Sequence, residues 1–206
     1  NRIYAGSDAS FGFSLSQAGY FHISAGAGFF LHESQAEQGV FSGNIRYVSN
    51  LTPAGSYMIR NFINLNYTAG IRRYRDEYIS VIKEDAFSTF SNDSLKGSRR
   101  LKAGMESVIF SPVNFYGFRF ALFGFAEGVL LEGLEAPTGY RSFLSAIGLG
   151  IRIRNDNLVF KTFQIRLGYY PSLPPWSEMS NLIISGEKLL RPRNFDPGPP
   201  GIQQYR

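Results

Sequence analysis

The stretch Tyr57-Met-Ile-Arg-Asn-Phe-Ile-Asn-Leu-Asn-Tyr-Thr-Ala-Gly-Ile71 alternates two kinds of side chain along its whole length. One parity is apolar and is interrupted only by Asn61 and Ala69, while the other parity is largely polar. Successive residues of a β-strand point to opposite faces of a sheet. The stretch therefore predicts a long strand with one apolar face and one largely polar face.

The same alternation recurs in eight further runs, which are separated by turn signals such as Gln17-Ala-Gly and Ala136-Pro-Thr-Gly. The further runs are 10–16, 21–32, 41–47, 101–109, 118–125, 143–154, 159–169 and 181–185. Strands of soluble proteins usually have about five or six residues, whereas a tilted strand needs about 9–11 to cross the hydrocarbon of a membrane. The longer runs therefore predict an all-β, antiparallel transmembrane β-barrel, with lipid outside and polar filling inside.

Composition excludes several other classes of protein. The chain has 206 residues, of which 44% are hydrophobic, 16% aromatic and 18% charged, with a formal net charge of +5. Such a chain can bury enough apolar surface to fold, so it is not predicted to be disordered. It has no cysteine, which excludes disulfides and thiol chemistry. No stretch is long and apolar enough to predict a membrane-spanning helix.

The sequence also lacks the patterns typical of enzymes and cofactor sites. His22 and His32 lie ten residues apart in one predicted strand, about 33 Å along it, and so cannot share a metal ion. The pairs Gly26-Ala-Gly and Gly148-Leu-Gly lack the third glycine and the following helix of a nucleotide-binding loop. The cations are spread over many strands rather than clustered. We therefore expect no enzymatic activity, no cofactor, no metal and no nucleic-acid partner.

The nine predicted strands have a consequence for domain organisation. Single-chain bacterial barrels close with an even number of strands, and an unpaired edge is not tolerated in lipid. We therefore expect residues 1–187 to be the C-terminal part of a larger barrel, and 188–206 to be an irregular, proline-rich tail. The opening at Asn1, without a signal-peptide pattern, predicts a start inside a longer protein. The long, charged segment 72–97 is expected to be an extracellular loop that folds into the lumen.

Three segments carry a resemblance to a known family. They are Leu101-Lys-Ala-Gly-Met-Glu-Ser-Val-Ile-Phe-Ser-Pro with the following Gly117-Phe-Arg-Phe-Ala-Leu-Phe-Gly-Phe-Ala-Glu-Gly, the segment Ala146-Ile-Gly-Leu-Gly-Ile-Arg-Ile-Arg-Asn-Asp-Asn-Leu-Val-Phe, and the loop 72–97. Together they resemble the barrel of the bacterial surface-antigen superfamily, over roughly residues 20 to 170. The resemblance implies the C-terminal half of a sixteen-stranded barrel that follows periplasmic domains.

The resemblance also implies roles for particular residues. In the family, an arginine at the tip of the long loop pairs with an acidic residue on strand thirteen, which corresponds to Glu127 in Phe125-Ala-Glu-Gly. The family's Gly-any-Gly-any-Arg strand corresponds to Gly148, Gly150 and Arg152. The loop tip departs from the pattern, because Glu84-Asp-Ala-Phe-Ser-Thr-Phe90 holds neither the arginine nor the glycine.

Some alternatives remain open at these positions. Arg72, Arg73 or Arg75 are candidates to replace the missing loop-tip arginine. Alternatively, Glu127 is a solvated interior carboxylate that pairs with an arginine of a neighbouring strand such as Arg152. The two glycines of the 143–154 run either ease bending of the barrel or admit a close approach.

The family assembles, inserts or translocates outer-membrane proteins, so the resemblance implies this role in the outer membrane of a Gram-negative bacterium. The expected partners are outer-membrane lipids including lipopolysaccharide, client β-barrel proteins or subunits of an envelope complex, and the missing N-terminal strands or periplasmic domains. A non-catalytic accessory barrel that scaffolds an envelope complex is one alternative. A soluble extracellular β-sandwich that acts as a binding module is the other.

Overall fold

The computed structural model of the chain describes residues 3–32, 35–71, 79–81, 92–132, 142–155, 162–172 and 182–189. All the regular structure in these ranges is β-strand. The strands are β1 Ile3–Leu15, β2 Gly19–His32, β3 Gln35–Ser49, β4 Thr52–Ala54, β5 Tyr57–Ile71, β6 Ile79–Val81, β7 Asn92–Gly97, β8 Arg99–Phe115, β9 Phe118–Glu132, β10 Ser142–Asn155, β11 Thr162–Tyr169 and β12 Leu182–Leu189. No helix that could span a membrane occurs within these ranges.

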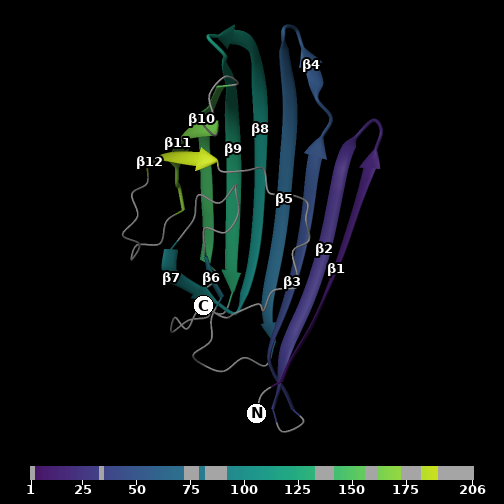
Figure 1. Cartoon of the computed structure of the whole chain (residues 1–206). Helices are drawn as coiled ribbons and strands as arrows, with labels where there is room; N and C mark the ends of the chain where they lie inside the picture. Colours follow the sequence, from purple (N-terminus) through teal and green to yellow (C-terminus); the bar gives the residue numbers. More distant parts are fainter. Residues whose placement is uncertain are drawn as a thin grey trace.

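One large antiparallel sheet dominates the structure (Figure 1). Its strands follow the order β1-β2-β3-β5-β8-β9-β10-β11-β12, and the short β4 pairs with β5. Each long strand therefore lies beside the long strand that precedes it in the chain. The sheet twists and curves from β1 at one edge to β12 at the other, and these edges do not pair with each other in the described sheet. The all-β, antiparallel class is thus confirmed, and the described sheet is open.

Each of the nine predicted runs corresponds to one long strand of this sheet, but three details differ from the sequence analysis. The sheet has ten strands because the three-residue β4, too short to show an alternation, also pairs with β5. The segment 72–97, expected to be a loop, contains the two-stranded sheet β6–β7. The last strand continues to Leu189, so the first two residues of the predicted tail are in β12. The rest of the tail lies outside the described residues.

The two ends of the large sheet differ in the length of their connections. At the first end, which we call the turn end, β1 and β2 join within Leu15–Gly19, and β8 and β9 join through Tyr116 and Gly117 alone. Both of these turn residues have positive φ, 49° and 80°, as a type I′ hairpin requires. The other end, which we call the loop end, carries the long connections between β5 and β8 and between β9 and β10.

The register keeps alternate residues on the same face across the whole sheet. One row of directly opposed residues runs through Phe13, Phe21, Tyr47, Ile63, Met105, Ala126, Ile147, Tyr169 and Leu182. We call the face that holds this row the outer face, and the opposite face the inner face.

The outer face is apolar and exposed. Many of its large apolar side chains on β2 to β12 are between 36% and 72% exposed, among them Ile23, Phe41, Ile45, Ile63, Leu65, Leu101, Met105, Ile109, Leu122, Phe143, Ile147, Leu149, Ile165, Leu167, Leu182 and Ile184. By register, the charged side chains described on this face are Arg99 and Glu132. Arg99 begins β8 and Glu132 ends β9, so the described middle of the outer face is free of charge.

The inner face carries the core. Its buried apolar side chains gather on β8 to β11 and just beyond, and they are Val108, Ala121, Phe123, Phe125, Val129, Leu131, Leu144, Ala146 and Tyr170. Buried polar and charged side chains share this face, including Asn64, Lys102, Glu106, Glu127, Gln164 and Arg166. The inner face therefore mixes buried polar and charged groups with apolar ones, whereas the outer face exposes apolar groups. In a water-soluble antiparallel sheet the exposed face is polar instead.

Candidate functional site: buried ion pairs on the inner face

Two ion pairs lie next to each other on the inner face of β8 to β11. The first joins β9 to β11, where Arg166 Nη2 donates to Glu127 Oε1 at 3.0 Å. The Arg166 and Glu127 side chains are only 3% and 1% exposed. At this burial an ion pair is weakly screened by water, and its two charges depend on each other for compensation.

The second ion pair joins β10 to β8 and extends to β11. Arg152 Nη2 donates to Glu106 Oε2 at 2.7 Å, and Nη1 lies 2.7 Å from Oε1. The Nε of the same guanidinium donates to Gln164 Oε1 at 2.8 Å. One arginine thus contacts a carboxylate and an amide with all three of its nitrogens, a geometry that a lysine could not reproduce.

Each guanidinium also lies over an aromatic ring of β9. The Cζ of Arg166 is 4.0 Å from the ring centre of Phe125, and that of Arg152 is 4.4 Å from the ring centre of Phe123. Both distances are within the range of a cation–π attraction. The cations are therefore held by a carboxylate on one side and by an aromatic face on the other.

The rings lie against the backbone of β10 because two residues there lack a side chain. A Cβ placed on Gly148 would come within 2.6 Å of Phe125 Cζ and Cε1 and would also overlap the carbonyl oxygen of Leu167. A Cβ on Gly150 would overlap Phe123 Cζ and would lie 2.5 Å from the Ile165 carbonyl oxygen. The structure therefore assigns the two glycines to a close approach of aromatic rings. We use the name stacked cluster for the group formed by Gly148, Gly150, Phe123, Phe125, Arg152, Arg166, Glu106, Glu127 and Gln164.

A methyl group at either glycine should destabilise the fold. We expect Gly150→Ala to lower the free energy of unfolding by about 1–3 kcal/mol, because the ring and a backbone carbonyl would both have to move. Gly43→Ala is the matched control: Gly43 is also in a strand, and its new Cβ would meet only Phe41 Cε1 at 3.9 Å. Denaturant unfolding followed by circular dichroism measures both variants. If both variants had the same free energy of unfolding, the close approach of the ring to Gly150 would not be needed for stability.

The stacked cluster balances its charges, since two arginines face two glutamates. Within the described residues, Gln164 Nε2 and Arg166 Nε are buried donors without an acceptor. Both lie on β11 and on the same face, two residues apart. Chemically, the cluster can hold four strands together and still has two donors for further acceptors. No group of three or more histidine, aspartate or glutamate side chains in the described ranges is placed to hold a metal ion.

The structure brings together most of the site residues that the sequence singled out. Glu127, Arg152, Gly148, Gly150 and Phe125 all belong to the stacked cluster. The expected pairing differs, however, because Arg152 contacts Glu106 and the cation at Glu127 is Arg166. On the inner face Arg152 lies opposite Ala121, nearer the turn end than Glu127, which lies opposite Ala146. The other candidates, Arg72, Arg73, Arg75 and Phe90, lie outside the described residues.

Sequence reasoning missed four members of the cluster, Phe123, Glu106, Gln164 and Arg166. A signal for the last three was present, because each is a polar or charged residue in the middle of a strand, on the parity opposite the apolar one. Charges at such positions have to be paired if the face is buried. Their partners depend on the registers of β8 to β11, which alternation alone does not fix.

Comparison of the chain with known proteins gives no match. No protein-family model fits the sequence, and searches of the curated proteins and of the solved structures give no significant similarity.

Proposed function

We propose that the chain is part of a β-barrel of the bacterial outer membrane that assembles, inserts or translocates other outer-membrane proteins. The observation that supports the membrane location best is the outer face, whose exposed apolar residues extend across nine strands without a charge in the middle. On β9 the apolar positions run from Phe118 to Leu130. This is about 40 Å along a strand, or about 30 Å along the membrane normal at a tilt of ~40°, the thickness of a bilayer's hydrocarbon core.

Aromatic pairs on the outer face support the same location. The ring centres of Phe21 and Tyr47 are 4.6 Å apart, and the Tyr47 hydroxyl donates to the Ala18 carbonyl oxygen at 2.6 Å. Closer to the loop end, the ring centres of Phe41 and Tyr67 lie 6.3 Å apart. Aromatic residues on the lipid-facing side are typical of membrane barrels, whose short turns lie on the periplasmic side and whose long loops lie outside.

The directions of the edge strands support a larger barrel. In a meander of nine antiparallel strands, β1 and β12 run in the same direction. They therefore cannot pair with each other in the antiparallel manner. For the same reason, the edge strands of two copies of the chain inserted in the same orientation cannot form antiparallel pairs. Antiparallel closure needs an odd number of additional strands, and a sixteen-stranded barrel meets this condition with seven. In the proposed mechanism a weak seam in that barrel accepts strands of client proteins.

The assembly role rests on the resemblance of the sequence, and one observation favours the accessory scaffold as a second candidate. The cation at Glu127 is Arg166, a residue of the sheet itself. The loop tip also lacks an arginine. In this arrangement the strands of the barrel are held together by residues of the sheet, without a contribution from the loop. The sandwich alternative needs a second sheet against the outer face, and in the described part of the chain the only other sheet is the two-stranded β6–β7.

Depletion of the protein in the organism that encodes it distinguishes these candidates. If the protein is an assembly factor, we expect the folded, heat-modifiable fraction of other outer-membrane barrels to fall several-fold, because their strands would no longer be templated. Gel mobility of those barrels without and with heating is the measurement. Unchanged client folding, together with constant partners in detergent pull-downs, would instead establish the scaffold. Recovery of the protein in the aqueous phase without detergent would refute the membrane location and both barrel candidates.

A further inference from the structure

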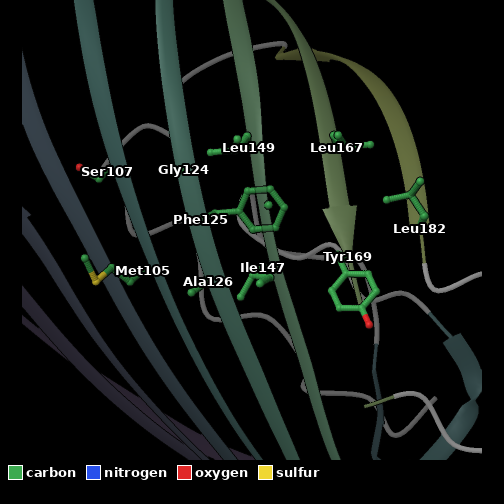
Figure 2. A pocket seen from close by; sticks show the side chains of 11 residues that line it. Met105, Ser107, Gly124, Phe125, Ala126, Ile147, Leu149, Leu167, Tyr169 and Leu182 are labelled. Carbon is green, nitrogen blue, oxygen red and sulfur yellow. The ribbon is translucent and has the colours of Figure 1, made fainter. Parts of the chain in front are cut away.

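The outer face has a hollow where β8 to β12 pass side by side (Figure 2). Its volume is about 550 Å³, which is within the range of about 300–1,000 Å³ found for ligand pockets. Its described lining consists of Met105, Ser107, Gly124, Phe125, Ala126, Ile147, Gly148, Leu149, Leu167, Tyr169 and Leu182. None of these residues is charged, and the Ser107 and Tyr169 hydroxyls are the only polar side-chain groups among them. We call this hollow the outer groove.

Small residues make the outer groove, and tall apolar ones surround it. Ser107 lies directly opposite Gly124, and Gly124 lies directly opposite Leu149. A Cβ on Gly124 would meet Leu149 Cδ2 at 3.5 Å and the Gly148 carbonyl oxygen at 3.9 Å, both ordinary contacts. The space above Gly124 is therefore open to a larger group. In Figure 2 the side chains of Leu167, Tyr169 and Leu182 project around the same region from β11 and β12.

The depth of the outer groove matches the middle of a bilayer. Met105, which lines it, is six residues from Arg99, the charged residue at the loop end of β8. Six residues correspond to about 20 Å along a strand, or about 15 Å along the membrane normal at a tilt of ~40°. Half the hydrocarbon thickness of a bilayer is also about 15 Å. A lipid of either leaflet can therefore reach the groove with the end of its acyl chain.

We propose that the outer groove binds one acyl chain of a membrane phospholipid in a fixed position. This inference rests on the proposed membrane location and adds a specific ligand site to it. The site is continuous with the apolar outer face and open to the side on which lipid lies. Its lining is almost entirely apolar, with the Ser107 and Tyr169 hydroxyls as its polar side-chain groups. An unbranched hydrocarbon chain is the occupant that this lining accepts without leaving a polar group unpaired.

Filling the groove tests the proposal. The whole protein that contains this chain is reconstituted in nanodiscs of phosphatidylethanolamine and phosphatidylglycerol and analysed by native mass spectrometry. We expect the wild-type protein to retain one phospholipid after the other lipids have been stripped. Gly124→Leu places a side chain in the groove and should lower the occupancy of that lipid about tenfold, the factor that accompanies lost burial of about two methylene groups.

Gly43→Leu is the matched control, because Gly43 is also an outer-face glycine with open space but lies on β3, outside the groove. It should retain the lipid as the wild type does. Ala126→Leu is a second groove-filling variant and should behave like Gly124→Leu if both fold, as judged by their heat-modifiable gel mobility. Equal retention in all variants, retention of detergent only, or a dimer that covers the groove would overturn the inference. Each of these results is compatible with membrane insertion, whereas failure to insert into nanodiscs would overturn the proposed location itself.

Discussion

Glu127→Ala is expected to lower the free energy of unfolding by about 3–5 kcal/mol. The change removes the carboxylate that lies 3.0 Å from the buried guanidinium of Arg166, and the loss of one partner of a buried ion pair leaves an uncompensated charge. The cation would keep the face of Phe125, which is worth much less than the carboxylate. Guanidinium unfolding of the protein in detergent micelles, followed by circular dichroism, measures the effect.

A double variant separates the cost of the lone charge from the loss of packing. With Glu127→Leu and Arg166→Leu together, no charge stays unpaired, so we expect most of the stability to return. Glu132→Ala is the exposed comparison, since Glu132 is 42% exposed and lies 3.6 Å from an arginine that is 58% exposed. It should change stability by less than about 1 kcal/mol. If Glu127→Ala lowered the free energy of unfolding as little as Glu132→Ala does, the stacked cluster would not stabilise the fold.

Ile63→Arg is expected to destabilise the protein in a bilayer by about 2–4 kcal/mol. Ile63 is 45% exposed and lies in the row of Met105, at the level of the bilayer centre in the proposed location. An arginine on the lipid-facing side of a membrane barrel costs this much at the midplane and only about 0–1 kcal/mol near the interfaces. Folding titrations in phospholipid vesicles provide the measurement.

Ile71→Arg is the control for depth. Ile71 ends the same strand at the loop end, is 56% exposed, and lies two residues beyond Ala69, which is opposite the charged Arg99. Its substitution should be nearly neutral. If Ile63→Arg were equally neutral, the outer face would be in contact with water, and the proposed membrane location would be wrong. The two variants differ only in depth, so a general intolerance of arginine on this strand would affect both.

The sequence alone predicts the strands of the large sheet well, for a physical reason. The stretch 57–71 is apolar on one parity over its full length because a single environment faces that whole side of the strand. β4 could not be predicted, because three residues are too few to show the two-residue alternation of a strand. The segment that holds β6 and β7 could not be predicted either, because its composition is polar and charged, and such a composition does not favour strands.

The candidate site could be predicted only in part. Glu127 and Arg152 stand out as charges within apolar runs, but which cation meets which anion depends on register. Register is set by turns such as Tyr116-Gly117, by bulges such as that between Phe110 and Asn114, and by packing between neighbouring strands. The function of Gly148 and Gly150 depends likewise on two phenylalanines that lie one strand away.

The meander has an evolutionary consequence. Every long strand pairs with its predecessor in the chain, so the smallest unit that can be gained or lost without disturbing the others is one hairpin. Duplication or deletion of β2 and β3, for example, would leave the alternation of every remaining strand intact and change the width of the sheet by two strands. A sheet of this design can vary in width between descendants of one ancestor while the stacked cluster, confined to β8–β11, is inherited unchanged.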